Sequence, residues 1–536
     1  MGVESLANQQ TYVSSSYYYS IVYLPVCEFM MAINSQHVVP IHILDDDSLL
    51  NIFYLYRPNF LGEDDDDLDR LTGGRESWNR GRWWYQLVHV CQRWRNLILG
   101  SASYLRLSLV CTNGTLVENV LADSPHLPLT VDYMGWDSIT AEDEEGILLA
   151  LKQRHRIRHL RLFFPERILR RLFVAIEGEF PILELLIVVP WPKNTALMLP
   201  ETLQTPNLHH LTLFGFVCPI RSRLHPTATG LVTLCLLIDH QSAYFQPNVL
   251  LQWILFMPRL ENLEITFTLP ASDGDAERQL TYIPITTHIT LPNLQYFRFR
   301  GDGDYLEGIV RWITTPRLEN LHIRLFQQLT FSFSHLPQFM KTTVHLKFDS
   351  VNIMFEDERI HLTGTFREAD THIFSARVDC WLLDQQVSSG AQICNALSQV
   401  LSAVDHLKLD YEIHSLSSEE HNDVRRIEWR NLLRSFSNVK TLHVEGGLVE
   451  EISRCLRLED GELPLELLPE LRQLRYPGIG DAGDPFTSFI DARQNADRPV
   501  TLVRDSLRSF PSPSPSSFEP PAITSPGDEA ENYIET

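Results

Sequence analysis

The chain has 536 residues, of which 44% are hydrophobic and 21% charged, and its formal net charge is −23. This length allows more than one domain and a large buried core. The composition is that of a soluble globular protein. The acidic balance argues against a general nucleic-acid or acidic-membrane binder, because phosphate contacts require clustered Lys and Arg side chains.

The N-terminal region is apolar over residues 17–33, YYYSIVYLPVCEFMMAI. It has no basic flank, contains Pro25 and Glu28, and is too short and interrupted to predict a signal peptide or a spanning helix. We therefore expect residues 1–37 to be an unstructured lead-in.

Eight cysteines are spread along the chain without a CxxC pair or a Cys/His cluster. This distribution predicts neither a disulfide framework nor a zinc site. Cysteines in apolar runs such as VTLCLLI (232–238) are interpreted as reduced core residues. We accordingly expect a reducing compartment, cytoplasmic and/or nuclear.

The first well-patterned segment, LDDDSLLNIFYLYR (44–57), predicts a helix whose start is capped by Asp45 to Asp47. A polar, glycine-containing insert (57–82) follows, with an acidic run from Glu63 to Asp67. That run lacks the glycine and glutamate spacing of a calcium loop. The insert is interpreted as a solvated loop.

Residues 83–99, WWYQLVHVCQRWRNLIL, predict a second helix with an unusually wide apolar arc. At about 100° per residue the arc covers nearly half of the circumference, whereas an ordinary surface helix buries a narrower stripe. Arg95 is the only charged residue inside it. The arc consists of Trp83, Trp84, Leu87, Val90, Cys91, Trp94, Leu97 and Ile98.

These two segments resemble the F-box, the short helical module that docks on the Skp-type adaptor of Skp-Cullin-F-box ubiquitin ligases. The usual pattern is Leu-Pro-x-x-x-Leu-x-x-Ile-Phe, then a Trp (here Trp84), a Val-Cys and a further Trp. Asp45 stands at the position of the proline, and the insert splits the module. The resemblance implies a wide apolar arc, because one side packs on its own domain and another on the adaptor. It implies an F-box-like domain over 38–104 that binds the adaptor through Leu44, Leu49, Leu50, Ile52, Phe53, Val90, Cys91 and Trp94.

From residue 157 onward, the pattern apolar-x-x-apolar-x-apolar recurs, often with a proline two residues ahead. Its first eight central positions are 23 to 34 residues apart, whereas leucine-rich repeats run about 20–29 residues around L-x-x-L-x-L. Each L-x-L puts two side chains on one face of a short strand. The copies lie at 157–162, 181–188, 206–213, 231–236, 258–265, 292–299, 316–323, weakly 343–348, 404–409, 439–444 and 469–476.

The repeats predict an α/β fold, in which the helical module precedes an irregular leucine-rich-repeat solenoid (105–505) with a curved, largely parallel sheet. Apolar helical stretches lie between strands, at 248–256, 305–313 and 427–436. The unit 349–403 breaks the period, and extra antiparallel strands are expected there. Residues 105–121 predict a strand, a turn and a helix that form an atypical capping unit.

Over residues 38–505 the chain is similar to fungal, especially basidiomycete, F-box-like proteins with degenerate leucine-rich repeats. The similarity is carried by residues 83–99, by SYLRLSLVCTNGT (103–115), and by the stretches 384–409 and 430–444. It implies adaptor binding but names no target.

The exposed positions between and beside each L-x-L form a candidate target-binding face. They mix aromatic, cationic and amide groups, which suits a folded protein surface more than nucleic acid. The candidate residues are His159, Arg161, His210, Tyr296, Arg298 and His322.

No sequence motif meets the structural requirements of a catalytic, cofactor or metal site. The GxGxxG match at 478–483 follows Pro477 and contains an aspartate, with another directly after it, so it does not predict a dinucleotide site. Arg300-Gly301-Asp302 and the GDGD run (301–304) are interpreted as a turn, and HRIRH (155–159) has arginines that repel a metal ion. The tail 506–536, rich in proline and serine, is expected to be disordered, with Ser-Pro pairs at Ser512, Ser514 and Ser525.

The leading hypothesis is therefore a substrate-recruiting subunit of a Skp-Cullin-F-box ubiquitin ligase. Its partners would be the adaptor, through it the cullin, and an unknown target protein, with no nucleic acid, membrane or cofactor. Catalysis would belong to the partners. Two alternatives are an interaction scaffold whose F-box-like helices are purely structural, and an enzyme whose site the motifs do not reveal.

Overall fold

The computed structural model divides into two compact units. The described residues up to Leu107 form a helical unit, and those from Ser108 onward form a larger unit built on one sheet. The described residues are 43–57, 82–123, 127–133, 139–191, 197–217, 223–240, 244–270, 288–326, 330–366, 372–412, 426–459, 462–463, 465–477 and 484–505. The lead-in, the acidic run, the GxGxxG match and the tail lie outside these ranges.

The helical unit contains α2 (Asp46–Tyr56), α5 (Trp83–Val88) and α6 (Gln92–Gly100). Helix α2 begins as predicted: the Asp45 carboxylate accepts a hydrogen bond of 2.7 Å from the Ser48 amide. Asp46 and Asp47 follow in its first turn, near the positive end of the helix dipole.

The prediction of one continuous helix over 83–99 is wrong. The chain leaves helical geometry after Val88, and Cys91 is extended, with φ −159° and ψ 169°. Its Sγ accepts a hydrogen bond of 3.5 Å from the Trp94 amide, so Cys91 is the N-cap of α6. Because the break changes the direction of the chain, the residues of the predicted arc do not share one helical face.

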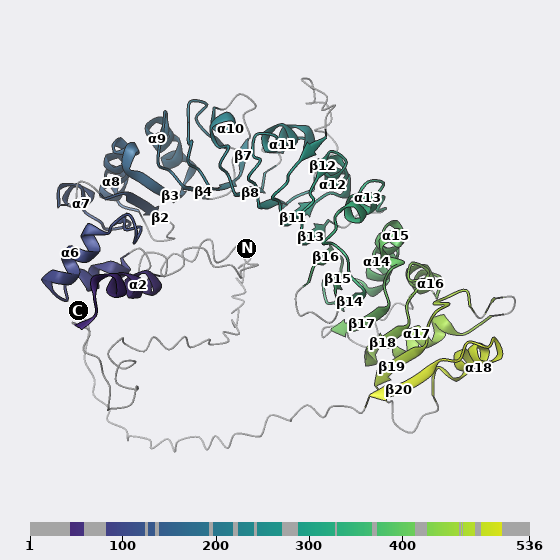
Figure 1. Cartoon of the computed structure of the whole chain (residues 1–536). Helices are drawn as coiled ribbons and strands as arrows, with labels where there is room; N and C mark the ends of the chain where they lie inside the picture. The colour runs from purple at the N-terminus through teal and green to yellow at the C-terminus, as the bar shows by residue number, and fades with distance from the viewer. Residues whose placement is uncertain are drawn as a thin grey trace, which may run out of the picture. The chain divides into compact units, whose positions relative to one another are not determined.

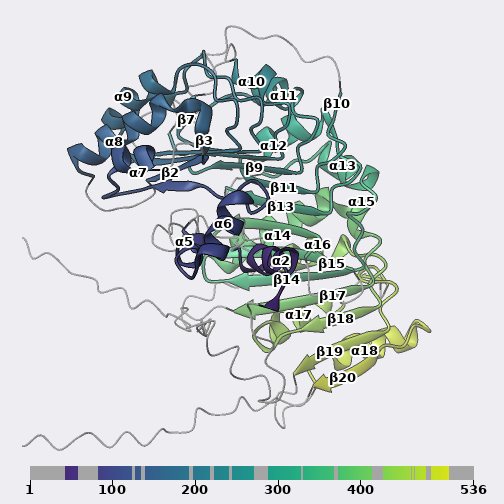
Figure 2. The same ribbon diagram turned by 60° about the vertical axis from the view of Figure 1, so that its left-hand side comes forward.

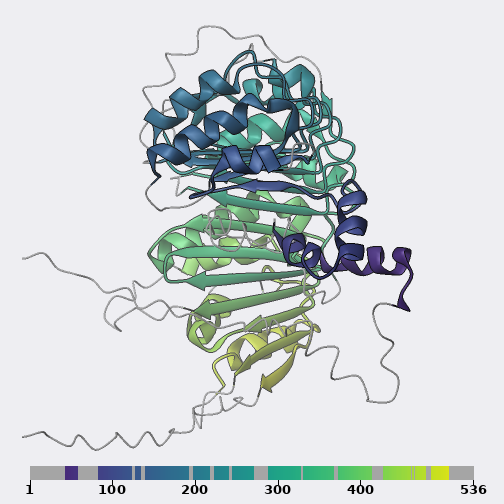
Figure 3. The ribbon, with the colours of Figure 1, turned by 90° about the vertical axis from the view of Figure 1, so that its left-hand side faces the viewer.

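The second unit contains a 16-stranded sheet in the order β1-β2-β3-β4-β6-β8-β9-β11-β13-β16-β15-β14-β17-β18-β19-β20 (Figures 1 and 2). Figure 3 shows its strands stacked one after another. The strands are β1 (Leu109–Cys111), β2 (Leu129–Tyr133), β3 (Ile157–Phe164), β4 (Leu185–Pro190), β6 (His210–Phe214), β8 (Thr233–Ile238), β9 (Asn262–Phe267), β11 (Tyr296–Gly301), β13 (Asn320–Leu325), β14 (Ser350–Glu356), β15 (Arg359–Thr365), β16 (Phe374–Asp379), β17 (His406–Glu412), β18 (Thr441–Val444), β19 (Gln473–Pro477) and β20 (Thr501–Asp505).

Two small parallel pairs accompany this sheet, β5 (Leu197–Met198) with β7 (Phe216–Val217) and β10 (Ile289–Thr290) with β12 (Ile313–Thr314). The helices that follow the strands line the outer side of the arc of strands in Figure 1. They are α7 (Val117–Asp123), α8 (Ala141–Lys152), α9 (Glu166–Ile176), α10 (Leu224–Thr227), α11 (Pro247–Ile254), α12 (Gly303–Val310), α13 (Leu336–Thr342), α14 (Leu383–Ala396), α15 (Ser398–Leu401), α16 (Arg426–Arg434), α17 (Val449–Leu456) and α18 (Thr487–Asn495). We call the opposite side of the sheet the helix-free face, with reference to the described residues of this unit.

One continuous row of apolar side chains forms the centre of the core. The central residues of successive repeats pair in parallel from strand to strand, and each is at most 1% exposed. Side chains alternate between the two faces of a strand, so their neighbours point to the helix-free face. The row consists of Leu160, Leu186, Leu211, Leu234, Leu263, Phe297 and Leu321. This arrangement is a mixed α/β fold with a large, mainly parallel sheet, consistent with a leucine-rich-repeat-like fold.

The unit 349–403 interrupts the parallel order as expected. β15 is antiparallel to both β14 and β16, while β14 pairs in parallel with β17. The weak repeat at 343–348 was a wrong prediction, because these residues form no strand and the ladder begins only at Ser350. Its central residue Leu346 is nevertheless buried, which explains why the apolar pattern persists there.

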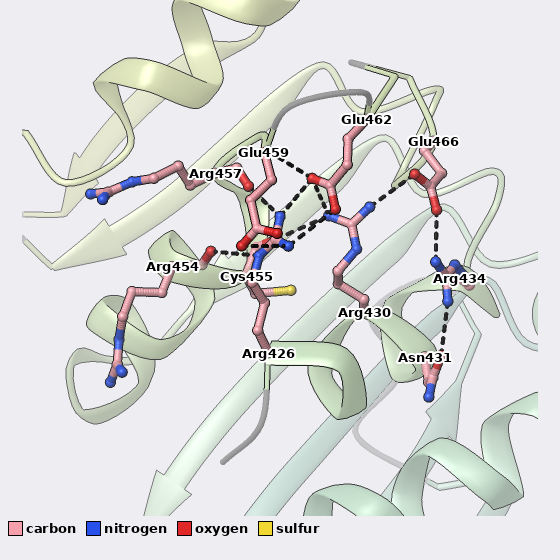
Figure 4. Close-up of polar contacts among 10 residues, drawn as sticks. All are labelled: Arg426, Arg430, Asn431, Arg434, Arg454, Cys455, Arg457, Glu459, Glu462 and Glu466. Carbon is pink, nitrogen blue, oxygen red and sulfur yellow. Dashed lines mark hydrogen bonds and ion pairs between the residues drawn. The ribbon is translucent and has the colours of Figure 1, made fainter. Parts of the chain in front are cut away.

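The C-terminal repeats are fastened by three arginines of α16 that project toward one stretch of chain after α17 (Figure 4). Arg426 pairs with Glu462 at 2.6 Å, and Arg430 pairs with Glu466 at 2.9 Å. Arg434 reaches the same Glu466 at 2.7 Å. Because arginines four residues apart lie on one helical face, this ladder ties α16 to the following repeat.

Candidate interaction surfaces

The helical unit is held together by an aromatic contact between α2 and α6. The rings of Phe53 and Trp94 meet edge to face, with centroids 4.9 Å apart. Leu49 and Phe53 are 0% and 2% exposed. Two of the eight predicted adaptor-binding residues are therefore interior residues, whose apolar side chains pack within the chain itself.

The other six predicted adaptor-binding residues are accessible to different degrees. Ile52, Val90 and Cys91 are exposed, whereas Leu44, Leu50 and Trp94 are half-buried. The structure thus divides the motif into an interior pair, a half-buried group and an exposed group that spans α2 and the start of α6.

Beside the predicted Ile52, helix α2 presents two further apolar side chains, Leu55 and Tyr56, that the sequence pattern did not single out. Leu55 is 81% exposed, and Ile52 and Tyr56 are 43% and 47% exposed. Residues at positions i, i+3 and i+4 lie on one helical face, so these three form an apolar surface on α2. We call Ile52, Leu55 and Tyr56 the α2 surface.

Arg93 is a second residue that the pattern missed. Its guanidinium donates to the Asp46 carboxylate at 2.7 and 2.9 Å and to the Leu44 carbonyl at 2.7 Å. It therefore fixes the start of α2 against α6. The aspartates at the start of α2 were predicted as helix caps, but their contact with an arginine was not, because that arginine lies 47 residues away in the chain.

The candidate target-binding residues all lie on the helix-free face and are half-buried. The structure brings three of them together: the Tyr296 and His322 rings are 5.2 Å apart, and the Arg298 guanidinium lies 5.6 Å from the Tyr296 ring centroid. Arg298 also pairs with Glu264 at 3.7 Å. This group spans β9, β11 and β13.

The remaining candidates lie apart from that group, nearer the N-terminal end of the sheet. On β3, Arg161 pairs with Asp132 at 3.5 Å, and His159 lies 3.9 Å from Glu184. His210 lies on β6, where burial, followed by the nearby His209, lowers its pKa. The six residues therefore do not form a single site.

An apolar stretch on β4 lies between the candidates of β3 and His210 of β6. Leu185 and Ile187 of β4 pair with His210 and Thr212 of β6. Both Leu185 and Ile187 are buried, although their positions alternate with those of the core row. Every residue of β4 is buried. They cluster with four further buried residues, Phe163, Val189, Phe214 and Leu237.

Within the described ranges, no group of three or more His, Cys, Asp or Glu side chains could hold a metal ion, and no helix is long and apolar enough to cross a membrane. The Arg300-Gly301-Asp302 tripeptide spans the end of β11 and the N-cap of α12. A Cβ on Gly301 would lie 2.8 Å from the Phe267 ring, so close packing explains this glycine.

Comparison with known proteins gives no family. No family model and no curated protein matches the sequence. Among solved structures, the leucine-rich repeat-containing protein LegL7 from Legionella pneumophila is similar, with 11% sequence identity and a TM-score of 0.23, covering 74% of this chain and 99% of that one. The fold assignment rests on the strand and helix repeats described above and not on this similarity.

Proposed function

We propose that this chain is a protein-interaction subunit with two separate surfaces. The helix-free face binds a target protein, and the helical unit docks on a Skp-type adaptor, which makes the chain a substrate-recruiting subunit of a Skp-Cullin-F-box ubiquitin ligase. The catalytic chemistry belongs to the partners, and this chain supplies proximity. A leucine-rich-repeat-like fold suggests the protein-interaction role.

The observation that carries the adaptor part is the α2 surface. Large apolar side chains exposed together on one short helix mark interaction sites more often than isolated ones do. Val90 and Cys91, also exposed, precede α6. Anchors of this kind dominate interface energies, at about 2 kcal/mol or more each. The resemblance to the F-box motif supports the choice of partner.

The experiment is co-purification of the full chain with a Skp-type adaptor. We expect the wild type to retain the adaptor and the Ile52→Gln/Leu55→Gln variant to lose it. Val174→Gln on α9 is the matched control, because Val174 is 72% exposed on a helix of the other unit. An adaptor that binds neither protein, or both equally, contradicts the adaptor part of the proposal.

A second function is favoured by one specific observation. Leu49 and Phe53, two central residues of the F-box-like motif, are used to pack the helical unit itself. The motif is then explained by internal packing, and the chain is an interaction scaffold without a ligase. Absence of the adaptor, together with a target that remains bound to the helix-free face, supports this alternative.

A further inference from the structure

Three arginines from three neighbouring strands stand directly opposite one another on the helix-free face. Arg300 of β11 pairs in register with Arg324 of β13, which pairs with Arg377 of β16. We call these three residues the arginine row. Neighbouring strands are about 4.8 Å apart, and like charges directly opposite one another destabilise a sheet. The arrangement therefore costs stability. It is also unusual in a protein with a net charge of −23, in which acidic residues are plentiful.

The carboxylate of Asp379 compensates Arg324 more closely than Arg300. It accepts two hydrogen bonds from Arg324 Nε, at 3.1 and 3.2 Å, whereas Arg300 Nη2 is 3.9 Å from it. Within the described part of the chain, the buried Nε of Arg300 has no hydrogen-bond partner. One carboxylate thus serves two guanidinium groups, and Arg300 keeps unused donors.

Strand β15 adds one cationic and one neutral group beside the row. Arg359 lies opposite Asp379 and pairs with Glu356 at 3.2 Å. His361 lies opposite Arg377, and its Nε2 is 2.9 Å from Ser375 Oγ. Burial, followed by Arg377, lowers the pKa of His361 to about 3, so its ring is neutral near pH 7.

The row is accessible to a ligand. The side chains of Arg300 and Arg324 are 30% and 33% exposed. Burial first, and then the positive charge of the neighbouring Arg324, lower the pKa of Arg300, so the two cations repel each other. A bound anion would relieve this repulsion and satisfy the remaining donors at once.

We propose that the arginine row binds an acidic segment of a protein partner. This inference rests on the proposed function and names the chemistry of the target. Guanidinium groups bind carboxylates and phosphates through paired hydrogen bonds, and alternate side chains of an extended peptide are about 6.5–7 Å apart, within reach of neighbouring strands. Glu264 and Glu356 lie on strands of the same region, so the cationic track is too short for a nucleic-acid backbone, which needs many phosphate contacts.

The test measures the fluorescence anisotropy of a short labelled peptide with glutamate at alternate positions, titrated with the full chain. Matched peptides carry phosphoserine or glutamine at those positions, and a single-stranded DNA oligonucleotide tests the other macromolecule. We expect both anionic peptides to bind and the glutamine peptide not to bind. A stronger signal from phosphoserine identifies a phosphorylated target segment, and equal signals identify a carboxylate-rich one.

The Arg300→Gln/Arg324→Gln variant is expected to bind the anionic peptides with an affinity that is lower by about tenfold or more. Arg170→Gln/Arg171→Gln on α9 removes the same charge from two side chains that are 62% and 60% exposed, and it should leave the affinity unchanged. Arg300→Lys/Arg324→Lys keeps the charge, removes the paired geometry, and should give an intermediate loss. Thermal melting identifies any variant that does not fold, in which case the lysine variant decides.

The proposal is overturned if the wild type and the folded glutamine or lysine variants bind the peptides with equal affinity. It is also overturned if the same arginines bind DNA more tightly than the anionic peptides. The adaptor provides an independent readout. Loss of peptide binding by a glutamine variant that still captures the adaptor supports the row. If the wild type captures the adaptor but binds neither anionic peptide, the proposal for the arginine row is overturned and the adaptor part of the proposed function is not. If the wild type binds an anionic peptide but does not capture the adaptor, only the ligase part of the proposed function is overturned.

Discussion

The ring of Phe53 meets the ring of Trp94 at an interplanar angle of 67°, with the two centroids 4.9 Å apart. This contact joins α2 to α6, and Phe53 is 2% exposed. Edge-to-face pairs contribute about 0.5–1.5 kcal/mol beyond the buried area. The residue that the F-box-like motif would assign to a partner is thus part of the structure that presents the α2 surface.

We predict that Phe53→Ala destabilises the helical unit by about 3–5 kcal/mol, the usual cost of removing a buried phenylalanine side chain. Hydrogen exchange of the α6 amides should accelerate while that of the sheet stays unchanged. Tyr54→Ala is the matched control, because Tyr54 is the next residue of α2 and is 42% exposed. Equal acceleration in the two variants would mean that Phe53 does not hold the unit together.

Cys91→Ser should stabilise α6. The thiol accepts the Trp94 amide proton only weakly, at 3.5 Å, and serine is a preferred N-cap residue whose hydroxyl is a better acceptor. The expected gain is about 0.5–1 kcal/mol, measured as slower exchange of the Trp94 amide. Cys91→Ala, which removes the acceptor, should shift the exchange in the opposite direction. Serine and alanine variants that behave alike would argue against the cap.

Glu307→Ala should loosen the start of α13. The Glu307 carboxylate accepts hydrogen bonds from three successive backbone amides, of Ser334, His335 and Leu336, at 2.7 to 2.9 Å. Hydrogen bonds to a charged group are worth about 1.5–3 kcal/mol, so we expect a loss of that order in the free energy of unfolding. Exposed Glu319, replaced in the same way, is the control. A loss no larger than that of the control would contradict the capping role.

The Arg426 to Glu462 contact makes the C-terminal repeats sensitive to acid. The hydrogen bond from Arg426 lowers the pKa of Glu462 to about 2, below its ordinary value of 4.5. A lowered folded-state pKa contributes stability that is present above the unfolded pKa and is lost as the pH falls toward the folded one. We therefore expect Glu462→Gln to lower the melting temperature at pH 7, and the difference from wild type to shrink between about pH 4.5 and pH 2. Glu319→Gln should show no such trend, and a difference that is constant with pH would refute the assignment.

The repeats could be predicted from the sequence because each strand carries its own L-x-L signal. β3, β6, β9, β11 and β13 all overlap predicted copies and extend one or two residues past them, and the break at 349–403 indicated the antiparallel strands. The sequence of β4 did not reveal that both faces of this strand are buried, because a continuous apolar run looks the same whether one face is covered or two. The strands β2 and β20 lack the pattern and were not predicted.

The candidate sites were predicted less well, because they depend on contacts between distant segments. Nothing in VHVCQRW marks a helix break, since neither proline nor glycine is present and a thiol is an unusual cap. The arginine row had a readable trace: Arg300 and Arg324 each lie three residues after the central residue of a repeat, at Phe297 and Leu321. Arg377 belongs to a strand outside the period, so only the register of β13 with β16 reveals it.

We propose that the helical unit and the helix-free face are separate binding surfaces for an adaptor and a target. Hydrogen exchange of the full chain, alone and with a purified Skp-type adaptor, can distinguish the two surfaces. We expect slower exchange within α2 and the start of α6 when the adaptor is added, with the strands β9 to β16 unchanged. Protection of those strands instead, or no protection anywhere at saturating adaptor, would contradict it.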